Sequence, residues 1–231
     1  MTKNGMLITI LTLFPQMFEG PFSSSIISRA VKEHKITLSF VNIRDFAKDK
    51  YKTVDDRPYG GGVGMIMKVD VADRAITHAK SLFPEKKPYV ILMDPQEKHY
   101  QQAEAQLLSE KEHLIFLCAH YEGIDQRVRQ LADAEFSIGD YILTGGEIPA
   151  MVMVDSIVRL IPGVLAKTES AKNESFSDPN LLEGPQYTNP QVYNGMEVPR
   201  VLLSGNHKII DQWKKEEARK TTILHRPDMV K

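Results

Sequence analysis

The apolar positions of the chain fall into short runs that alternate with stretches of helical spacing. Runs of β-branched and other apolar residues predict five strands, at residues 7–13, 36–43, 89–93, 114–118 and 134–138. Apolar residues at helical spacing predict helices between and after them, at residues 26–31, 102–110, 124–131 and 148–160. Such alternation is typical of an α/β fold in which helices pack on a mostly parallel sheet.

The predicted helix at residues 148–160 is apolar almost all round, with Asp155 and Arg159 as its only charges. A helix of this kind is expected to be buried, and a buried guanidinium needs an anionic partner. Two interpretations stay open. Asp155, one turn earlier, could pair with Arg159, or Arg159 could point out of the helix end into a cleft.

The last third of the chain has a different composition. Only five of the residues 166–185 are apolar, against 42% for the whole chain, which is typical of a flexible linker or a functional lid. Helical spacing returns within residues 200–231, where Ile209 and Trp213 lie one turn apart. We therefore expect an α/β domain at residues 1–165, a linker or lid at residues 166–185, and a small, mostly helical domain at residues 186–231.

The charges of the chain are nearly balanced but unevenly placed. The 231 residues include 29 Lys and Arg against 30 Asp and Glu, a net charge of −1. This balance excludes a uniformly basic surface that binds nucleic acid everywhere. Residues 200–231 nevertheless carry eight basic and four acidic side chains, a net +4, which leaves −5 for the rest. The basic end is either a solvated helix face or a segment that binds a polyanion.

Cysteine usage and the apolar runs indicate the compartment. Cys118 is the only cysteine, which excludes an internal disulfide and a Cys-based zinc site and fits a reducing cytoplasm. The longest run without Asp, Glu, Lys or Arg covers residues 4–18, and its 15 residues are too few to span a bilayer as a helix. We expect a cytoplasmic protein with no membrane segment and no signal peptide.

Glycine-rich clusters are the main candidate binding elements. They cover residues 55–65, 119–125 and 138–147, and the last two follow predicted strands directly. Glycines permit positive φ and close backbone approach. Each cluster alone could be a simple turn, but together they favour a small-molecule site at the carboxyl ends of neighbouring strands. The chain has no P-loop, no His-Glu-x-x-His, no Gly-x-Ser-x-Gly and no complete dinucleotide fingerprint.

In their order along the chain, these clusters resemble the bacterial tRNA (guanine-N1)-methyltransferases of the TrmD family. The resemblance runs over nearly the whole chain and is specific because many motifs of four or more residues recur in order. They include Leu11-Thr12-Leu13-Phe14-Pro15, Pro58-Tyr59-Gly60-Gly61-Gly62, Tyr121-Glu122-Gly123-Ile124-Asp125, Leu143-Thr144-Gly145-Gly146-Glu147, Glu174-Ser175-Phe176-Ser177-Asp178 and Leu202-Leu203-Ser204-Gly205-Asn206-His207.

The resemblance implies a SPOUT-type α/β fold, in which a parallel sheet carries a trefoil knot in the C-terminal part of the first domain. A small, mostly helical domain that binds tRNA follows. The resemblance further implies a homodimer whose active site is shared between subunits. S-adenosylmethionine would bind in the knot, at Leu92, Met93, Asp94, Pro95, Gln96, Ala119, Tyr121, Glu122, Gly123, Ile138, Gly139, Asp140, Tyr141, Ile142, Leu143, Gly145, Gly146 and Pro149.

Two of the implied cofactor segments depart from the usual family pattern. Asp94-Pro95-Gln96-Glu97 stands where the family usually has Ser-Pro-Gln-Gly, and Ala119 stands where it usually has glycine. A carboxylate near a sulfonium cofactor could attract it, or could disturb a hydrogen bond to its adenosine. By resemblance, the methyl group of Ala119 would lie where the backbone is expected to approach the ligand. These departures bear on cofactor affinity rather than on the class of reaction.

The implied reaction is methylation of N1 of the guanosine immediately 3′ of the tRNA anticodon. By resemblance, Asp178 acts as general base and Arg159 stabilises charge on the guanine O6. The expected RNA contacts are Tyr121, Glu122, Ser175, His207, Lys208, Lys214, Lys215 and Arg226. A requirement for Mg²⁺ is implied by resemblance alone, and no metal-ligating residues are predicted. The alternatives are an RNA-binding protein of the same fold with weakened or lost cofactor use, and a methyltransferase acting on another RNA.

Overall fold

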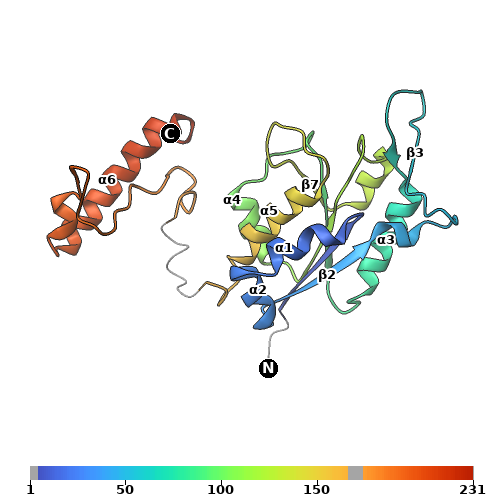
Figure 1. The fold of residues 1–231 in the computed structure, drawn as a ribbon, viewed down its shortest axis with the longest axis horizontal. Helices are drawn as coiled ribbons and strands as arrows, with labels where there is room; N and C mark the ends of the chain where they lie inside the picture. The colour runs from blue at the N-terminus through green and yellow to red at the C-terminus, as the bar shows by residue number, and fades with distance from the viewer. Residues whose placement is uncertain (1–4, 166–173, 231) are drawn as a thin grey trace. The chain divides into compact units, whose positions relative to one another are not determined.

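The computed structural model describes residues 5–165 and 174–230. The chain forms two compact units, Met1–Ala166 and Lys167–Lys231 (Figure 1). The first is a sheet with helices on both faces, and the second is built around one long helix. None of the helices in the described parts of the chain is long and apolar enough to cross a membrane.

The first unit contains a five-stranded sheet whose neighbouring strands are all parallel, in the order β2-β1-β6-β5-β7. The predicted strands are confirmed with ends shifted by one or two residues: β1 Met6–Thr12, β2 Ile36–Asn42, β5 Pro88–Met93, β6 His113–Leu117 and β7 Ala134–Phe136. All seven residues of the central strand β1 are buried. Strands covered on both faces read as continuous apolar runs, which is why this pattern predicted them.

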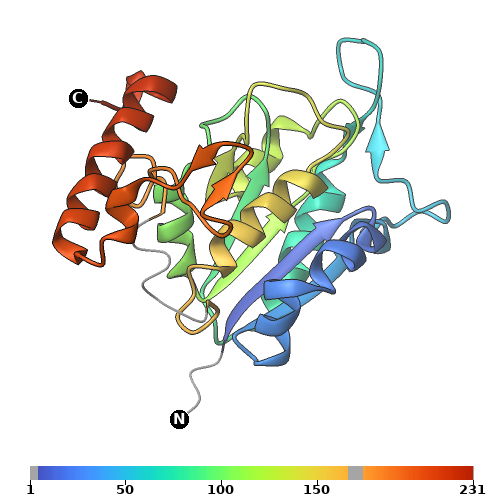
Figure 2. The same ribbon diagram turned by 60° about the vertical axis from the view of Figure 1, so that its left-hand side comes forward.

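Two hydrophobic cores lie on opposite faces of the sheet. One is packed beneath α1 (Glu19–Phe22), α2 (Ser25–Lys32), α4 (Gln102–Ser109) and α5 (Glu147–Val158). The other is packed beneath α3 (Val69–Ser81) and the 3-10 helix Gln126–Leu131. Figures 1 and 2 show α3 on one side of the sheet and α1, α2, α4 and α5 on the other. Side chains along β1 pack into both cores, because successive side chains of a strand point to opposite faces of the sheet.

Three details differ from the sequence-based prediction. The helix predicted at residues 124–131 is a 3-10 helix that covers only Gln126–Leu131, and Val128 is its one buried side chain. The helix predicted at residues 148–160 ends as α5 at Val158. The 13-residue helix α3 was missed, although its buried residues Val71, Ala72, Ala75, Ile76 and Ala79 have helical spacing. Its interspersed charged residues obscure that spacing. A short antiparallel pair, β3 (Asp55–Asp56) and β4 (Ile66–Met67), flanks the glycines of the first glycine cluster.

The second unit is organised by α6 (His207–His225) and also contains a small antiparallel pair, β8 (Val192–Tyr193) and β9 (Met196–Glu197). Residues 182–184, within the predicted lid, pack against α6. The backbone N–H of Leu182 donates to Oγ1 of Thr222 at 2.9 Å. Gly184 lies so close to α6 that an added Cβ would come within 3.0 Å of the Ala218 nitrogen. Residues 166–173 of the predicted lid lie outside the described residues.

Candidate active site

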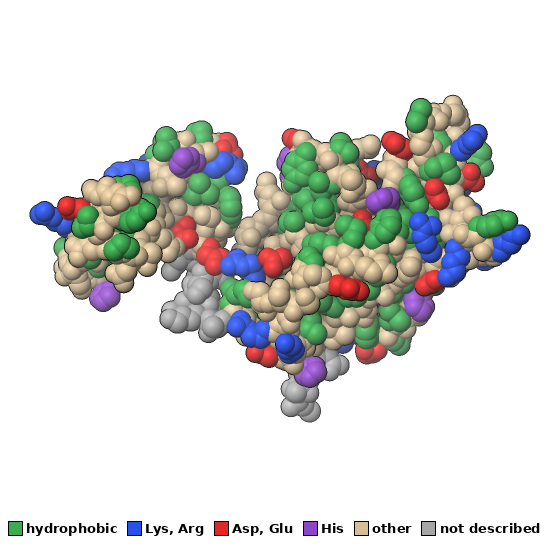
Figure 3. Space-filling view, viewed as in Figure 1, with side chains coloured by type: hydrophobic (Ala, Val, Ile, Leu, Met, Phe, Trp, Pro, Cys, Tyr) green, Lys and Arg blue, Asp and Glu red, His purple; other side chains and the backbone are tan. Residues whose placement is uncertain are grey.

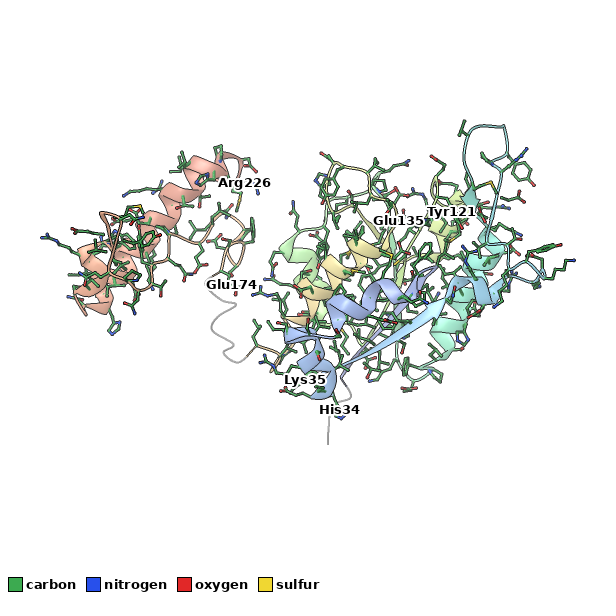
Figure 4. The ribbon with its side chains drawn as sticks, in the orientation of Figure 1. His34, Lys35, Tyr121, Glu135, Glu174 and Arg226 are labelled. Carbon is green, nitrogen blue, oxygen red and sulfur yellow. The ribbon has the colours of Figure 1, made fainter. Side chains whose placement is uncertain are left out.

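Three loops enclose a cavity of about 360 Å³ at one edge of the sheet. They follow β5, β6 and β7. Figure 4 labels Tyr121, which lies in the loop after β6. The carboxyl ends of parallel strands meet at one edge, and ligands of open α/β sheets bind there. The cavity is lined by Met93, Asp94, Pro95, Gln96, Ala119, His120, Tyr121, Glu122, Gly123, Phe136, Ser137, Ile138, Gly139, Tyr141, Ile142, Leu143, Thr144, Gly145, Gly146 and Pro149.

Most residues predicted to bind the cofactor therefore line a single cavity. Leu92 and Asp140 do not line it: Leu92 is buried within the sheet, and the exposed carboxylate of Asp140 pairs with His99 at 2.7 Å. Four lining residues were missed from the sequence: His120, Phe136, Ser137 and Thr144. His120, Ser137 and Thr144 each adjoin a predicted residue in the same loop, so the loops as wholes were the available signal, whereas Phe136 is the last residue of β7.

Direct backbone contacts join the loops after β6 and β7. The N–H of Gly146 donates to the carbonyl of Ala119 at 2.8 Å. A Cβ on Gly146 would lie 2.8 Å from the Cα of Cys118 and 2.9 Å from the nitrogen of Ala119, so only glycine fits without displacing the backbone. The N–H of Glu122 donates to the carbonyl of Met65 at 3.1 Å, which joins the first glycine cluster to this group.

A buried carboxylate lies behind the cavity. Glu147, the first residue of α5, is almost fully buried and accepts a hydrogen bond from the Thr12 hydroxyl at 2.8 Å. Its other oxygen lies 3.8 Å from Nδ1 of His120, which lines the cavity. Burial, and secondarily the charge of Glu147, raises the pKa of the Cys118 thiol well above its usual value. Cys118 is therefore protonated at neutral pH and is excluded as a nucleophile.

The charges around the cavity fit a cation better than a polyphosphate. Its lining includes the carboxylates of Asp94 and Glu122 and, among the described residues, no Lys or Arg. Asp94 is engaged on both oxygens, because it accepts from the N–H of Gln96 at 2.8 Å and from Arg129 at 2.7 Å. Tyr121 has a positive φ of 65°, uncommon for a side chain of this size, and its hydroxyl accepts from Arg44 at 3.3 Å.

The predicted catalytic arginine lies far from this cavity within one chain. Arg159 is the C-cap of α5, whereas the cavity-lining residues Gly146 and Pro149 lie at the start of that helix. Twelve residues of α-helix span about 18 Å at 1.5 Å per residue. Arg159 is partly exposed and follows the last residue of the helix, a position that agrees with the interpretation in which it points out of the helix end.

The predicted general base belongs to the second unit. Asp178 is exposed and stabilises its own loop, because its carboxylate accepts from the N–H of Asn180 at 2.8 Å. Its backbone carbonyl accepts from the N–H of Leu181 at 3.1 Å. The nearby Ser175 hydroxyl accepts from the N–H of Glu183 at 2.9 Å. An aspartate whose carboxylate accepts from the backbone N–H two residues later forms an Asx-turn, which is common for this residue.

The remaining predicted RNA-binding residues lie on or beside α6. His207, Lys208, Lys214 and Lys215 are exposed along that helix. Arg226, at its end in Figure 4, pairs with Asp228 through contacts of 3.0 and 2.8 Å, so its charge is partly compensated. Figure 3 shows Lys and Arg side chains at several places on this unit. Within residues 5–165 and 174–230, no group of three or more His, Cys, Asp or Glu is arranged to hold a metal ion.

Comparison with known proteins identifies the family. The family model described as tRNA (Guanine-1)-methyltransferase TrmD matches residues 6–231. A tRNA (guanine-N(1)-)-methyltransferase of Carboxydothermus hydrogenoformans is 54% identical over 227 residues, which cover 98% of this chain and 88% of that protein. Its counterpart in Syntrophomonas wolfei is 52% identical over 225 residues, covering 97% and 90%. The counterpart in Listeria innocua is 49% identical over 227 residues, covering 98% and 92%. The chain belongs to the TrmD family of tRNA (guanine-N1)-methyltransferases.

Proposed function

We propose that the protein transfers a methyl group from S-adenosylmethionine to N1 of the guanosine immediately 3′ of the anticodon in tRNA. The observation that carries this proposal is the family match over residues 6–231, with relatives near 50% identity that are tRNA (guanine-N(1)-)-methyltransferases. The three-loop cavity supplies a place for the cofactor. A tRNA substrate places the proposed reaction in the cytoplasm.

The residues of the cavity fit S-adenosylmethionine. When bound, the cofactor supplies a methyl group on a positively charged sulfur. The acidic side chain of Glu122 in the lining suits a cation, and the apolar side chains of Ile138 and Leu143 suit an adenine ring. The close backbone approach at Gly146 holds the loops after β6 and β7 together around the space proposed for the cofactor.

Two side chains would carry the acid-base chemistry. N1 of guanine bears a proton at neutral pH, which must leave before or as N1 attacks the methyl group. Asp178 would accept that proton, and the cationic Arg159 would stabilise the charge that moves onto O6. Tyr121 and Glu122 line the cavity, where they would contact the guanine as well. The family's requirement for Mg²⁺ stays a prediction.

The position of Arg159 favours a site shared between two subunits. Arg159 and the cavity lie at opposite ends of α5, too far apart for one guanine to meet both within a chain. We infer that Arg159 and Asp178 act in the cavity of a second subunit. An apolar strip on α5 supports a homodimer, because Ile148 and Val152, one turn apart, are 43% and 45% exposed. Ile142, in the cavity loop, is also exposed.

We infer that the chain is threaded as a trefoil knot around the cavity. The loop from β7 to α5 runs directly against the loop after β6, through the Gly146–Ala119 hydrogen bond and a bridge between His120 and Gly145. The strand order places β7 beside β5, whereas α5 begins against the loop that follows β6. A chain that passes back through neighbouring loops in this way supports the knot.

Gly146→Ala is expected to weaken S-adenosylmethionine binding by about ten-fold or more, measured by calorimetry without tRNA. The added methyl group would displace the backbone of Cys118 and Ala119, and even a small displacement of a preorganised site is costly. Gly20→Ala is the matched control, because a Cβ there meets nothing within 4 Å. Equal binding by both variants would contradict the placement of the cofactor against this loop.

Binding of tRNA is expected to weaken as salt rises, since contacts of Lys and Arg with phosphates release counterions. The variant Lys208→Gln/Lys214→Gln/Lys215→Gln should show a smaller slope of log affinity against log salt, by about 0.7 to 0.9 for each lysine that contacts a phosphate. Filter binding at several salt concentrations measures this. Lys80→Gln, a substitution on α3, is the control. An unchanged slope in the triple variant would show that these lysines do not contact phosphates.

The main alternative is an RNA-binding protein of this fold with weakened or lost cofactor use. Calorimetry with S-adenosylmethionine, followed by transfer of labelled methyl groups to a tRNA transcript, separates it from the enzyme. The proposal expects binding and transfer. Binding of tRNA without binding of the cofactor would favour the alternative instead.

A further inference from the structure

We propose that Arg129 is a positioning residue that holds the loop of residues 94–97 in place as one wall of the cofactor cavity. The inference rests on the proposed function for the identity of the ligand, and on the geometry of the first unit for the role of the arginine. Arg129 itself does not line the cavity.

One guanidinium joins three carboxylates from two other segments. Arg129 lies in the 3-10 helix Gln126–Leu131 and its side chain is only 14% exposed. Its Nη2 donates to Asp94 at 2.7 Å, and its Nη1 donates to Glu97 and Glu135. Asp94 and Glu97 are the first and last residues of the segment 94–97, which begins directly after β5, while Glu135 lies on β7, the strand beside β5.

The contacts of Arg129 enclose the part of the loop that faces the ligand. Pro95 and Gln96 lie between the two carboxylates that Arg129 holds, and both line the cavity. Asp94 also accepts from the N–H of Gln96 at 2.8 Å, so the same carboxylate shapes the turn and connects it to Arg129. A planar guanidinium can satisfy several carboxylates in a fixed geometry. The loop is thus fixed from behind at both ends, with its other side toward the cavity.

The charges of the cluster show what the arginine prevents. Burial raises the pKa of the Glu135 carboxyl, and the charges of Glu97 and Asp94 add to this effect, whereas Arg129 opposes it. Without the guanidinium, the three carboxylates would repel one another, and this repulsion would push the loop away from β7. The same contacts engage Asp94 with protein groups. Asp94 therefore acts on the cofactor through the loop rather than as a free charge.

The first test is the affinity for S-adenosylmethionine, measured by calorimetry in the absence of tRNA. Arg129→Met is expected to bind about ten-fold or more weakly, since charge-assisted hydrogen bonds to the loop are lost. Arg129→Lys should recover part of the affinity. Arg127→Met is the matched control, because Arg127 lies on the same 3-10 helix but is 65% exposed and pairs locally with Asp125. The triple variant Arg129→Met/Asp94→Asn/Glu97→Gln also removes the repulsion among the carboxylates. It should therefore bind S-adenosylmethionine more tightly than Arg129→Met does.

A second readout needs no ligand. Hydrogen exchange at the backbone amides of residues 96–98 should be faster in Arg129→Met than in the wild type or in Arg127→Met. Should Arg129→Met fail to fold, Arg129→Lys and Glu97→Gln provide the same comparison with smaller changes. Unchanged affinity and unchanged exchange in folded variants would overturn the inference. If the wild type bound no S-adenosylmethionine, the proposed function would fail, while the exchange experiment would still decide the role of Arg129.

Discussion

Asp178→Asn is expected to lower the rate of methyl transfer by about 10²- to 10⁴-fold, the usual contribution of a positioned general base. The amide keeps the size of the side chain and still accepts from the N–H of Asn180, a bond of 2.8 Å in the wild type. It cannot take the N1 proton. Single-turnover transfer to a tRNA transcript measures the rate of the chemical step.

The same variant should bind S-adenosylmethionine as the wild type does, because the proposed role of Asp178 is to take the N1 proton of the tRNA guanine and not to contact the cofactor. Asp211→Asn serves as the control, since Asp211 is an exposed aspartate on α6 and should leave the transfer rate unchanged. A transfer rate for Asp178→Asn close to that of the wild type would remove Asp178 as the base. A loss of affinity with an unchanged rate would assign it to binding.

Mixing two inactive variants is expected to restore activity. Asp178→Ala keeps an intact cavity, and Gly146→Val keeps an intact base but fills the space beside Cys118 and Ala119. If each site uses the cavity of one subunit and the base of the other, a mixed dimer holds one complete site. Random mixing of the subunits of a two-fold dimer should then give about a quarter of the wild-type activity.

A chain that carries both substitutions provides the complementary experiment. Mixed in equal amounts with wild type, it should leave activity only in wild-type dimers, again about a quarter, because each mixed dimer lacks a complete site. A site formed within one chain would instead leave about half of the activity. No activity in any mixture of the single variants would contradict the shared site, and with it the assignment of Arg159 across the subunit boundary.

Elements whose apolar residues are neighbours in the sequence could be predicted from the sequence. The five strands were predicted because both faces of the sheet are covered, and β1 is buried throughout. The cavity loops after β6 and β7 were predicted from glycine clusters that follow strands of a parallel sheet, whereas the loop after β5 was implied by the family resemblance. The helix α3 was missed because charged residues interrupt its apolar positions, although they face solvent in the structure.

Contacts that depend on the order of strands in the sheet could not be predicted from the sequence. Arg129 follows Asp94 by 35 positions, and only the placement of β7 beside β5 brings the three carboxylates to one guanidinium. The separation of Arg159 from the cavity likewise follows from the length and direction of α5. The open question of what Asp94 does in the cofactor loop required these contacts, because the two interpretations of its charge differ only in where the carboxylate points.

The central claim is methylation of one particular guanosine. The direct measurement uses labelled S-adenosylmethionine and two tRNA transcripts that differ only at the position 3′ of the anticodon, guanosine in one and adenosine in the other. After digestion, chromatography identifies the labelled nucleoside. The proposed function predicts 1-methylguanosine from the first transcript and no label in the second. Absence of label from both, equal label in both, or a different methylated nucleoside would contradict it.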